Sequence, residues 1–445
     1  MRNKCFFGIF ILLSTVLSSC AQSSGDEQRV KIAVGNTHSM AIKSDNSLWV
    51  WGENTFGQLG NGKKTLYDGY YSSTIVENND LYTPTKLLEN IIDIAAGNGF
   101  SLAVNSNNEL LTWGTNNYGQ LGNGTTIQIS NPQKILNDVV YIDAYGDTAV
   151  AIKRDNTLWM WGKDIRINLA TTPNNFLTSP VLILDNVKKA VVGSSCIIIL
   201  DNNNQVHGIG AVRELGINDR RPNEIITSPS LILSNIKEIA GSGQTLFALS
   251  HDSRLFGWGA QGNEGRVGNG SSESWVYSPV LISDSVEMVF SGFMFIKNDD
   301  SLWTWGHIRS LYNFRATIDG QNIDTGGGIL NTPMIIYDNR PVKIMDNVLI
   351  ACGNLFHRMV VDKKGNLYTW GNNQFGQLGN GNASIFGMIY DNDDNDNEGY
   401  FSFLQDNSVI NPTIIANLFV INERKLFRNL SFRTIPMIDK KNNII

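Results

Sequence analysis

Short apolar runs alternate with polar turns along most of this chain. Residues 39–42 form one apolar run, residues 44–47 a polar turn, and residues 48–51 the next apolar run. Asparagine, aspartate and glycine in such turns accept the positive φ that a tight hairpin needs. The pattern therefore predicts many short antiparallel strands rather than helices.

These runs belong to a unit that repeats at intervals of roughly 50 residues, which is typical of propellers and solenoids. The unit is marked by a tryptophan followed by glycine, with Ile209 and Gly210 as a degenerate copy. The other six pairs are Trp51 and Gly52, Trp113 and Gly114, Trp161 and Gly162, Trp258 and Gly259, Trp305 and Gly306, and Trp370 and Gly371. The sequence thus contains seven structural repeats.

Each repeat has room for four strands. The first is rich in small residues, as in 32–35, 94–97, 239–241 and 350–353, which suits inner strands crowded around an axis. The last carries a proline, which only an edge strand tolerates. These prolines are Pro84, Pro132, Pro180, Pro229, Pro279, Pro341 and Pro412. We predict an all-β, seven-bladed β-propeller with four-stranded blades over residues 30–423.

The repeats also suggest how the ring closes. No proline strand precedes the first unit, and none of the Trp-Gly pairs follows Pro412. We expect the Pro412 strand to complete the blade that the N-terminus opens, so that pairing of the N- and C-terminal segments closes the ring. Closure of this kind removes the exposed sheet edges that an open array would leave.

The loop after the tryptophan is specific enough to suggest a family. Residues 51–62 read Trp-Gly-Glu-Asn-Thr-Phe-Gly-Gln-Leu-Gly-Asn-Gly, and residues 113–124 and 370–381 follow the same pattern. This loop resembles the regulator-of-chromosome-condensation repeat family, and the similarity spans residues 30 to 420. The resemblance implies a seven-bladed propeller. It also suggests nucleotide exchange on a small GTPase, although propellers host many unrelated functions.

Charge and motif content exclude several function classes. The chain has 35 Lys and Arg against 41 Asp and Glu, a net charge of −6, which disfavours binding to nucleic acid. No motif of a hydrolase or zinc enzyme is present. The five histidines, His38, His207, His251, His307 and His357, show no metal-ligand spacing. We expect a monomer with no enzymatic activity, metal or cofactor, although His38 and His357 would be neighbours in a closed ring.

The N-terminus has the features of an export signal. Arg2 and Lys4 precede an apolar run over residues 6–16, which is too short to span a membrane. The following Leu-Ser-Ser-Cys (17–20) resembles the lipobox of bacterial lipoproteins. We therefore predict a signal peptide over 1–19, lipid attachment at Cys20, a tether over 20–29, and an extracytoplasmic location on a bacterial membrane. An ordinary signal peptide that happens to contain a cysteine is the alternative.

Three further features have more than one interpretation. Cys196 and Cys352 lie in apolar runs and are interpreted as buried thiols, with a disulfide as the alternative. The acidic segment 391–399 is interpreted as a solvated loop, with calcium binding as the alternative. The basic segment 424–445 fits no repeat, and its role is open.

Long insertions offer a candidate binding surface. The connection between the third and fourth strands is long in the first (63–83), sixth (307–340) and seventh (382–411) units, which are consecutive in a closed ring. Lengthening the same connection places all three on one face. They are rich in aromatic residues: Tyr67, Tyr70, Tyr71, Tyr82, Tyr312, Phe314, Phe386, Tyr390, Tyr400, Phe401 and Phe403. Exposed aromatic residues are typical of binding hot spots, although the loops could also fold onto each other.

From this surface we predict a scaffold that binds an unidentified protein and contacts a membrane through its N-terminal lipid alone. Three alternatives stay open. The chain could inhibit a secreted enzyme, or bind carbohydrate or cell wall through Trp and Tyr. Guanine-nucleotide exchange ranks below these, because export would remove the chain from any GTP pool.

Overall fold

The computed structural model describes residues 27–68, 75–166, 175–221, 224–262, 265–308, 315–318, 321–324, 336–383, 385–389, 400–405, 409–417 and 435–438. Several predicted features lie outside these ranges. They are the signal peptide, Cys20, most of the tether, Tyr70, Tyr71, Tyr312, Phe314, Tyr390, the acidic segment 391–399 and most of the basic C-terminal segment.

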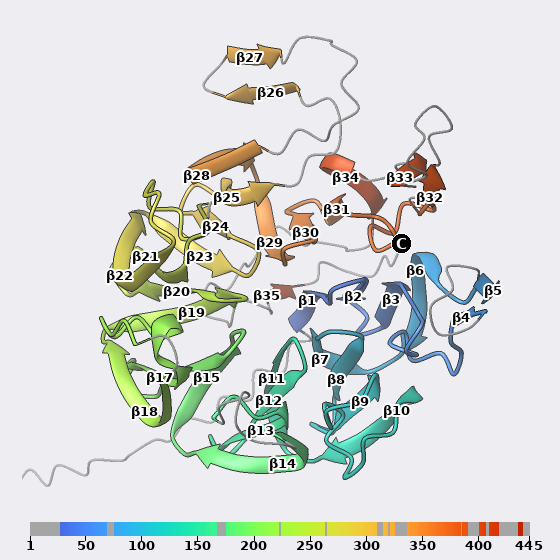
Figure 1. The fold of residues 1–445 in the computed structure, drawn as a ribbon, viewed down its shortest axis with the longest axis horizontal. Coiled ribbons are helices and arrows are strands. Elements are labelled where there is room, and N and C mark those ends of the chain that lie inside the picture. Colours follow the sequence, from blue (N-terminus) through green and yellow to red (C-terminus); the bar gives the residue numbers. More distant parts are fainter. Residues whose placement is uncertain are drawn as a thin grey trace, which may run out of the picture.

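The predicted fold is confirmed: seven four-stranded antiparallel sheets stand around a central axis (Figure 1). In each blade the strands follow chain order from the axis to the outer rim. Blade 1 consists of β1 (Glu27–Val34), β2 (His38–Ile42), β3 (Leu48–Gly52) and β6 (Leu81–Leu88), and blade 2 of β7 (Ile91–Ala96), β8 (Phe100–Asn105), β9 (Leu110–Gly114) and β10 (Ile129–Leu136). Blade 3 consists of β11 (Val139–Tyr145), β12 (Thr148–Lys153), β13 (Leu158–Lys163) and β14 (Phe176–Leu184), and blade 4 of β15 (Val187–Val192), β16 (Cys196–Asp201), β17 (Val206–Ala211) and β18 (Ile225–Leu233).

The other three blades have the same order. Blade 5 consists of β19 (Ile236–Ser242), β20 (Thr245–Ser250), β21 (Leu255–Ala260) and β22 (Trp275–Ser283). Blade 6 consists of β23 (Val286–Phe290), β24 (Met294–Lys297), β25 (Leu302–Ile308) and β28 (Ile336–Met345). Blade 7 consists of β29 (Val348–Gly353), β30 (His357–Asp362), β31 (Asn366–Gly371) and β34 (Val409–Asn417). The small-residue strands are innermost and the proline strands outermost, as predicted. A short 3-10 helix, η1 (Val212–Glu214), follows β17.

The turns explain why the chain is rich in asparagine. The turn between the second and third strands has one residue with positive φ in every blade. These residues are Asn46, Asn108, Asn156, Asn204, Ser253, Asp300 and Gly365. Asparagine tolerates this left-handed conformation better than other residues that have a side chain. The polar turns predicted from the sequence are therefore hairpin turns.

Strand direction gives the ring two distinct faces. The connections between strands 1 and 2 and between strands 3 and 4 lie on one face, where Glu53 N donates to Thr37 O at 3.0 Å. We name this the insertion face. The hairpin turns between strands 2 and 3, and the links from one blade to the next, lie on the opposite face, which we name the turn face. There Ile91 N donates to Asn46 O at 2.9 Å.

Ring closure differs from the prediction in one respect. The two ends of the chain do pair: residues 27–30 of β1 form an antiparallel ladder with β35 (Ile435–Ile438). The Pro412 strand, however, is the outer strand of blade 7 itself, and the Pro84 strand completes blade 1. The prediction that the Pro412 strand completes the N-terminal blade is wrong, because each unit contains all four of its own strands.

Four of the Trp-Gly tryptophans, Trp51, Trp113, Trp161 and Trp305, join two blades through the indole, whereas Trp258 Nε1 is buried without a hydrogen-bond partner. The indole Nε1 of Trp113 donates to Gln58 O in the loop of blade 1 at 2.8 Å. Trp51 Nε1 donates in the same way to Gln377 O of blade 7 at 2.9 Å. The glycine after each tryptophan has positive φ, and a Cβ at Gly114 would lie 2.4 Å from Gly99 O. First and last blades are therefore joined by the same contact that joins their neighbours.

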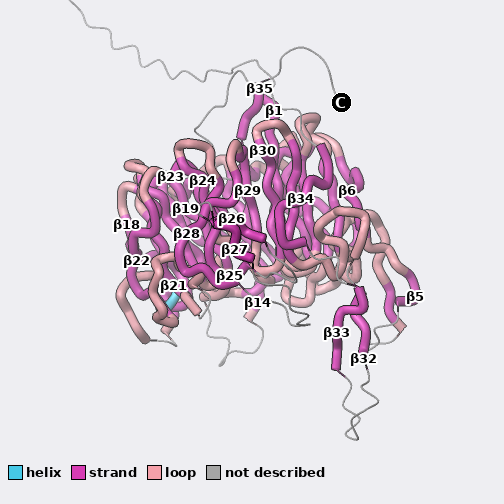
Figure 2. The backbone as a smooth tube through the Cα atoms, turned by 90° about the horizontal axis from the view of Figure 1, so that it is seen from above, coloured by secondary structure: helices cyan, strands magenta, loops and turns pink. Residues whose placement is uncertain are grey.

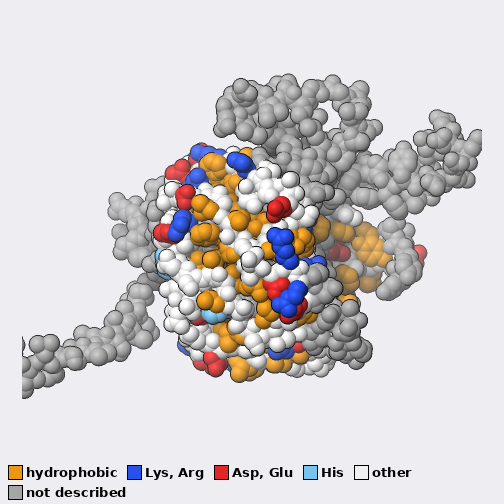
Figure 3. Space-filling model, turned by 60° about the vertical axis from the view of Figure 1, so that its left-hand side comes forward, with side chains coloured by type: hydrophobic (Ala, Val, Ile, Leu, Met, Phe, Trp, Pro, Cys, Tyr) orange, Lys and Arg blue, Asp and Glu red, His pale blue; other side chains and the backbone are white. Residues whose placement is uncertain are grey.

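The outer rim changes character around the ring. At one equivalent position, opposite the second residue of the third strand, blades 3, 4 and 5 carry the exposed residues Leu182, Leu231 and Leu281. Lysine occupies this position in blades 1, 2 and 6, as Lys86, Lys134 and Lys343. Lysine on an edge strand discourages pairing with other chains. Hydrophobic patches therefore interrupt the polar surface on the side of blades 4 and 5 (Figure 3).

Candidate functional site

Three hairpins project from consecutive blades, as the insertions predicted. They are β4 (Leu66–Tyr67) with β5 (Ile75–Glu77) from blade 1, β26 (Arg315–Ile318) with β27 (Gln321–Asp324) from blade 6, and β32 (Ile385–Ile389) with β33 (Tyr400–Gln405) from blade 7. All three leave the ring in the connection between the third and fourth strands. In Figure 1 the hairpins of blades 7 and 1 lie at the right of the ring, and β26–β27 lies apart from them beyond β28. In Figure 2 β4–β5 and β32–β33 extend away from the β1–β35 pair, whereas β26–β27 lies at the level of the ring.

The predicted aromatic residues within the described part of this surface have different environments. Tyr67 is half-buried, and this burial raises its pKa, beside the carboxylates of Asp80 and Glu53. Tyr82 packs against the loop of blade 7, where a Cβ on Gly376 would lie 2.3 Å from its ring. Tyr82 therefore also contributes to the seam between blades 1 and 7.

Four more of the predicted aromatic residues lie in the hairpin of blade 7. The backbone register places Phe386 opposite Phe403, Met388 opposite Phe401 and Ile389 opposite Tyr400. The hairpin thus brings together residues that are up to 20 positions apart, such as Ile385 and Gln405, from the two ends of one insertion.

The sequence analysis missed other exposed apolar residues on the insertion face. Phe56 and Tyr118 occupy the same position in the Trp-Gly loops of blades 1 and 2, and both are more than a third exposed. Phe356, in the first connection of blade 7, is similarly exposed. The sequence could have indicated Phe56 and Tyr118, because the loops that match the family pattern have an aromatic residue at this position. On the β5 strand, Ile75 and Val76 are also exposed.

A buried asparagine makes each of these loops rigid. In blade 1, Leu59 N donates to Asn54 Oδ1 at 3.1 Å, while Asn54 Nδ2 donates to Lys63 O at 3.1 Å. Asn116 and Asn373 make the corresponding bonds in blades 2 and 7. Burial raises the pKa of Asp80, which anchors the β4–β5 hairpin by accepting hydrogen bonds from Asn54 N and Thr65 Oγ1. The exposed side chains are therefore presented on a fixed frame.

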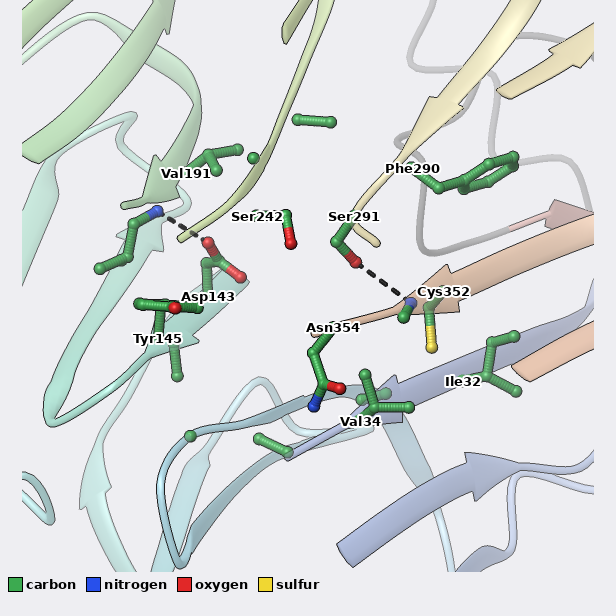
Figure 4. Close-up of a pocket in the computed structure, with 18 of the residues that line it drawn as sticks. Ile32, Val34, Asp143, Tyr145, Val191, Ser242, Phe290, Ser291, Cys352 and Asn354 are labelled. Atoms are coloured by element: carbon green, nitrogen blue, oxygen red, sulfur yellow. Dashed lines mark hydrogen bonds between the residues drawn. The ribbon is translucent and has the colours of Figure 1, made fainter. Parts of the chain in front are cut away.

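The central channel offers little space for a ligand. All seven inner strands line a cavity of about 80 Å³, and Figure 4 shows Phe290, Cys352 and Ile32 on one side of it and the polar side chains of Asp143 and Ser242 toward the other. Small-molecule sites typically have volumes of roughly 300–1,000 Å³. The cavity is therefore too small for a substrate or cofactor of ordinary size.

Charged residues in the channel wall link neighbouring blades. Lys31 Nζ of β1 lies 2.9 Å from Asp93 Oδ1 of β7, with both side chains buried. Lys189 of β15 pairs in the same way with Glu238 of β19, whose pKa is raised by burial. Asp143 Oδ2 accepts a hydrogen bond from Val192 N of the next blade at 2.9 Å. These charges serve the contacts between blades.

The two histidines that were expected to be neighbours sit in adjacent seams. His38 Nε2 lies 2.9 Å from Ser101 Oγ of blade 2, and Ser101 Oγ donates to Gln58 O at 2.8 Å. Because the serine proton goes to the carbonyl, His38 must donate from Nε2. His357 has the same relation to Ser39 of blade 1 at 2.8 Å. The histidines are thus buried, and each is hydrogen-bonded to a serine of the next blade.

These histidines are expected to make stability fall as the pH falls. Burial lowers the pKa of His38 to about 4 and that of His357 to about 3. Histidine in an unfolded chain binds its proton near pH 6.5, so below that pH the unfolded state binds more protons and gains stability. We expect a loss of about 2 kcal/mol for each histidine between pH 7 and pH 5. Urea unfolding at both pH values measures it.

A variant isolates this effect from the titration of carboxylates. His357→Gln keeps a donor toward Ser39 and cannot bind a proton in this range. Its unfolding free energy should change less between pH 7 and pH 5 than that of the wild type. Equal pH dependence in the two proteins would show that His357 does not cause the loss.

Other candidate chemistry is sparse among the described residues. Cys196 and Cys352 are free and buried, so the disulfide alternative is wrong. Burial raises the pKa of Cys196, as does the nearby Glu214 carboxylate. Within the ranges given above, no group of three or more His, Cys, Asp or Glu side chains is placed to hold a metal ion. No helix in the same ranges is both long and apolar enough to cross a membrane.

These features define a closed seven-bladed propeller of repeated four-stranded units. A model of the regulator of chromosome condensation (RCC1) repeat matches residues 30–58 and 91–120, and a second model of this repeat matches 45–104, 107–152 and 364–386. RCC1 repeats are therefore present within residues 30–152 and 364–386, where the loop pattern indicated them.

Curated relatives share only part of the chain. Human E3 ubiquitin-protein ligase HERC2 is 34% identical over 111 residues, which are 24% of this chain and 2% of HERC2. The RCC2 homolog of Danio rerio is 33% identical over 98 residues, which are 22% of this chain and 18% of that protein. The matches thus cover a small fraction of each relative, and a ligase is among the proteins that contain these repeats.

Two solved structures share the fold. Human WBSCR16 has a TM-score of 0.63 at 17% identity, covering 83% of this chain and 94% of its own. Prp20p of Saccharomyces cerevisiae, whose structure was described together with its binding to Gsp1p and histones, has a TM-score of 0.64 at 18% identity, covering 87% of this chain and 86% of its own. At these identities the similarity establishes the propeller fold alone.

Proposed function

We propose that this protein is a lipid-anchored, extracytoplasmic scaffold that binds another protein through the insertion face of blades 6, 7 and 1. The observation that carries the proposal is that three consecutive blades carry a hairpin in the same connection, and that exposed apolar side chains lie on the insertion face of blades 7 and 1. The bound protein would contact Phe56, Phe356 and Val76 together with the aromatic residues of the insertions. Clusters of this kind are typical of interfaces.

The position of the N-terminus supports an anchored scaffold. Residues 27–30 pair with β35 on the turn face, opposite the face from which the insertions leave (Figure 2). A lipid on Cys20 would attach the protein through this side. The insertion face would then point away from the membrane and be accessible to partners in the extracytoplasmic space.

The rigidity of the ring favours binding without rearrangement. The first and last blades are joined by the same indole and serine hydrogen bonds as blades 1 and 2. Loops fixed on such a frame lose little conformational entropy when they bind. The propeller would thus supply a pre-organised surface and the hairpins its specificity.

The tryptophans argue against carbohydrate binding by stacking. Six of the ten are the buried Trp-Gly residues of the core. The other four are each covered by a cation: Trp49 by Lys43, Trp159 by Lys153, Trp303 by Lys297 and Trp275 by Arg213. A sugar ring would have to displace these cations. A protein partner is therefore the better-supported ligand class.

Site-specific photo-crosslinking tests the binding face. A photoreactive amino acid at Val76, or at Phe386 in the blade 7 hairpin, should capture one protein partner on the native cell surface. The same probe at Asn203, an exposed turn residue on the opposite face, is the matched control. Deletion of residues 386–403 should abolish capture at Val76. Equal capture at Asn203, or undiminished capture by the deletion variant, would contradict the proposal.

The anchor is tested separately. Metabolic labelling with a palmitate analogue should modify the wild type, and Cys20→Ala should abolish the label. A wild type that carries no label would contradict lipid attachment while leaving the binding face open to the crosslinking test.

A further inference from the structure

Two arginines stack on two aromatic residues at the seam between blades 4 and 5. The Arg213 guanidinium, in η1, lies 4.9 Å from the ring centroid of Trp275. The Arg220 guanidinium lies 5.2 Å from the ring centroid of Tyr277. Both aromatic residues belong to the outer strand β22, and their rings stack with centroids 6.4 Å apart. This cluster, named the arginine–aromatic cluster, consists of Arg213, Arg220, Trp275 and Tyr277.

The cluster is held in place from below. Asn218 N donates to Tyr277 O at 2.7 Å, which ties the loop after η1 to strand β22. Leu215 of the same loop is fully buried in the core between the blades. Stacking fixes the plane of each guanidinium and leaves its edge available for hydrogen bonds, except at the buried Nε of Arg213. The two cations are therefore oriented before any ligand binds.

Nearby carboxylates form no ion pair with these cations, although the charge of Arg213 opposes the rise in the pKa of Glu214 that burial causes. The buried Glu214 carboxylate accepts hydrogen bonds from Ser195 N and from Gln244 Nε2, both at 3.1 Å. Asp219 and Glu224 both pair with Arg221. Among the residues that the structure describes, Arg213 Nε is buried without a hydrogen-bond partner, and neither Arg213 nor Arg220 forms an ion pair.

The charge on the rest of the molecule would not attract an acidic ligand to this cluster. The chain has a net charge of −6, and on this side positive and negative side chains are interspersed (Figure 3). No broad positive field would attract an acidic ligand here. A carboxylate would have to be recognised locally, by guanidinium groups whose planar edge matches it in two hydrogen bonds.

We propose that the arginine–aromatic cluster binds an acidic peptide segment, with one carboxylate on each guanidinium. Each arginine lies over its own ring, so the two charges suit two spaced carboxylates better than a single small anion. The same outer strand carries exposed Leu281, four residues beyond Tyr277, which would give a longer peptide an apolar contact. This site lies on blades 4 and 5, so it does not depend on the insertions of blades 6, 7 and 1.

Binding of a defined peptide tests the proposal. A short fluorescein-labelled peptide of alternating glutamate and glycine is titrated with the full folded chain at low salt, and binding is followed by fluorescence anisotropy. Arg213→Gln and Arg220→Gln should each weaken binding by about tenfold or more, the usual loss for a charged hydrogen-bond pair. A lysine–glycine peptide should not bind.

Arg154→Gln is the matched control, because it removes the same charge from an exposed arginine on the turn face of blade 3. It should change the affinity by less than about twofold, as expected for a distant screened charge. Thermal unfolding confirms that each variant is folded. Absence of binding by the wild type, or equal loss in Arg154→Gln, would overturn the proposal. So would inorganic phosphate that binds as tightly as the peptide, since it would identify a simple anion site.

Discussion

Replacing Gly114 by alanine is expected to destabilise the protein by about 4 kcal/mol, close to the largest effects seen for single substitutions. Gly114 has a φ of +110°, which a residue with a Cβ rarely adopts. The added Cβ would also lie 2.4 Å from Gly99 O and 2.6 Å from Phe100 Cα. Because both of these atoms belong to the backbone of blade 2, no rotamer change can relieve the contact. Denaturant unfolding measures the loss.

Gly146→Ala separates the two causes. Gly146 also has positive φ, at +55°, but a Cβ there meets nothing within 4 Å. This variant should lose only the cost of the left-handed conformation, about 1 kcal/mol. If Gly114→Ala were no more destabilising than Gly146→Ala, the close approach of the two backbones would not be the reason for glycine after the tryptophan.

Replacing Lys31 by methionine is expected to cost about 3–5 kcal/mol, the usual range when one partner of a buried ion pair is removed. Lys31 and Asp93 have side chains exposed by only 6% and 5%, and their atoms lie 2.9 Å apart. Methionine fills a similar volume and leaves the carboxylate of Asp93 buried without its cation. The change in unfolding free energy measures this cost.

The double variant Lys31→Met with Asp93→Leu is the control. It removes both charges and keeps apolar side chains at the seam between blades 1 and 2. Replacing a whole buried ion pair by apolar residues is often neutral or stabilising. The double variant should therefore be more stable than Lys31→Met alone. A double variant as unstable as the single one would show that the lysine acts by packing rather than by charge.

Much of the fold was predictable because each blade solves the same physical problem. Small residues were needed next to the axis, Asn and Gly at the turns, and proline only on the outer edge. The Trp-Gly pair marked the third strand even where Ile209 replaced tryptophan, since Gly210 keeps the positive φ of its counterparts. Local rules of this kind repeat seven times, so a single weak copy does not obscure the pattern.

The closure could not be predicted by counting proline strands. Both placements of the Pro412 strand satisfy the same backbone hydrogen bonds, because every proline strand is an interchangeable outer edge. The deciding contacts are long-range, such as Trp51 with Gln377 O, 326 positions away. The pairing of residues 27–30 with β35 involves a segment that matches no repeat, so no internal copy could indicate it.

The charged contacts between blades were partly within reach. Lys31, Asp93, Lys189 and Glu238 occupy the same position of their inner strands, one residue before the first apolar position of the inner layer. Aligning the repeats would have shown opposite charges in neighbouring units. The arginine–aromatic cluster was not predictable in this way, because Arg213 and Arg220 lie in a loop that keeps only part of the family pattern and have no counterparts in the loops that match it.

The direction of β1 has a mechanical consequence. Residues 27–30 of this strand pair with β35 and residues 31–34 pair with β2, so the chain is held along its whole length where it joins the ring. A pulling force between residue 27 and the opposite face would act along the strand, perpendicular to its ladder of hydrogen bonds. All of these bonds would then bear tension together instead of unzipping in turn. We therefore expect β1 to resist this force better than a strand whose hydrogen bonds are broken one after another.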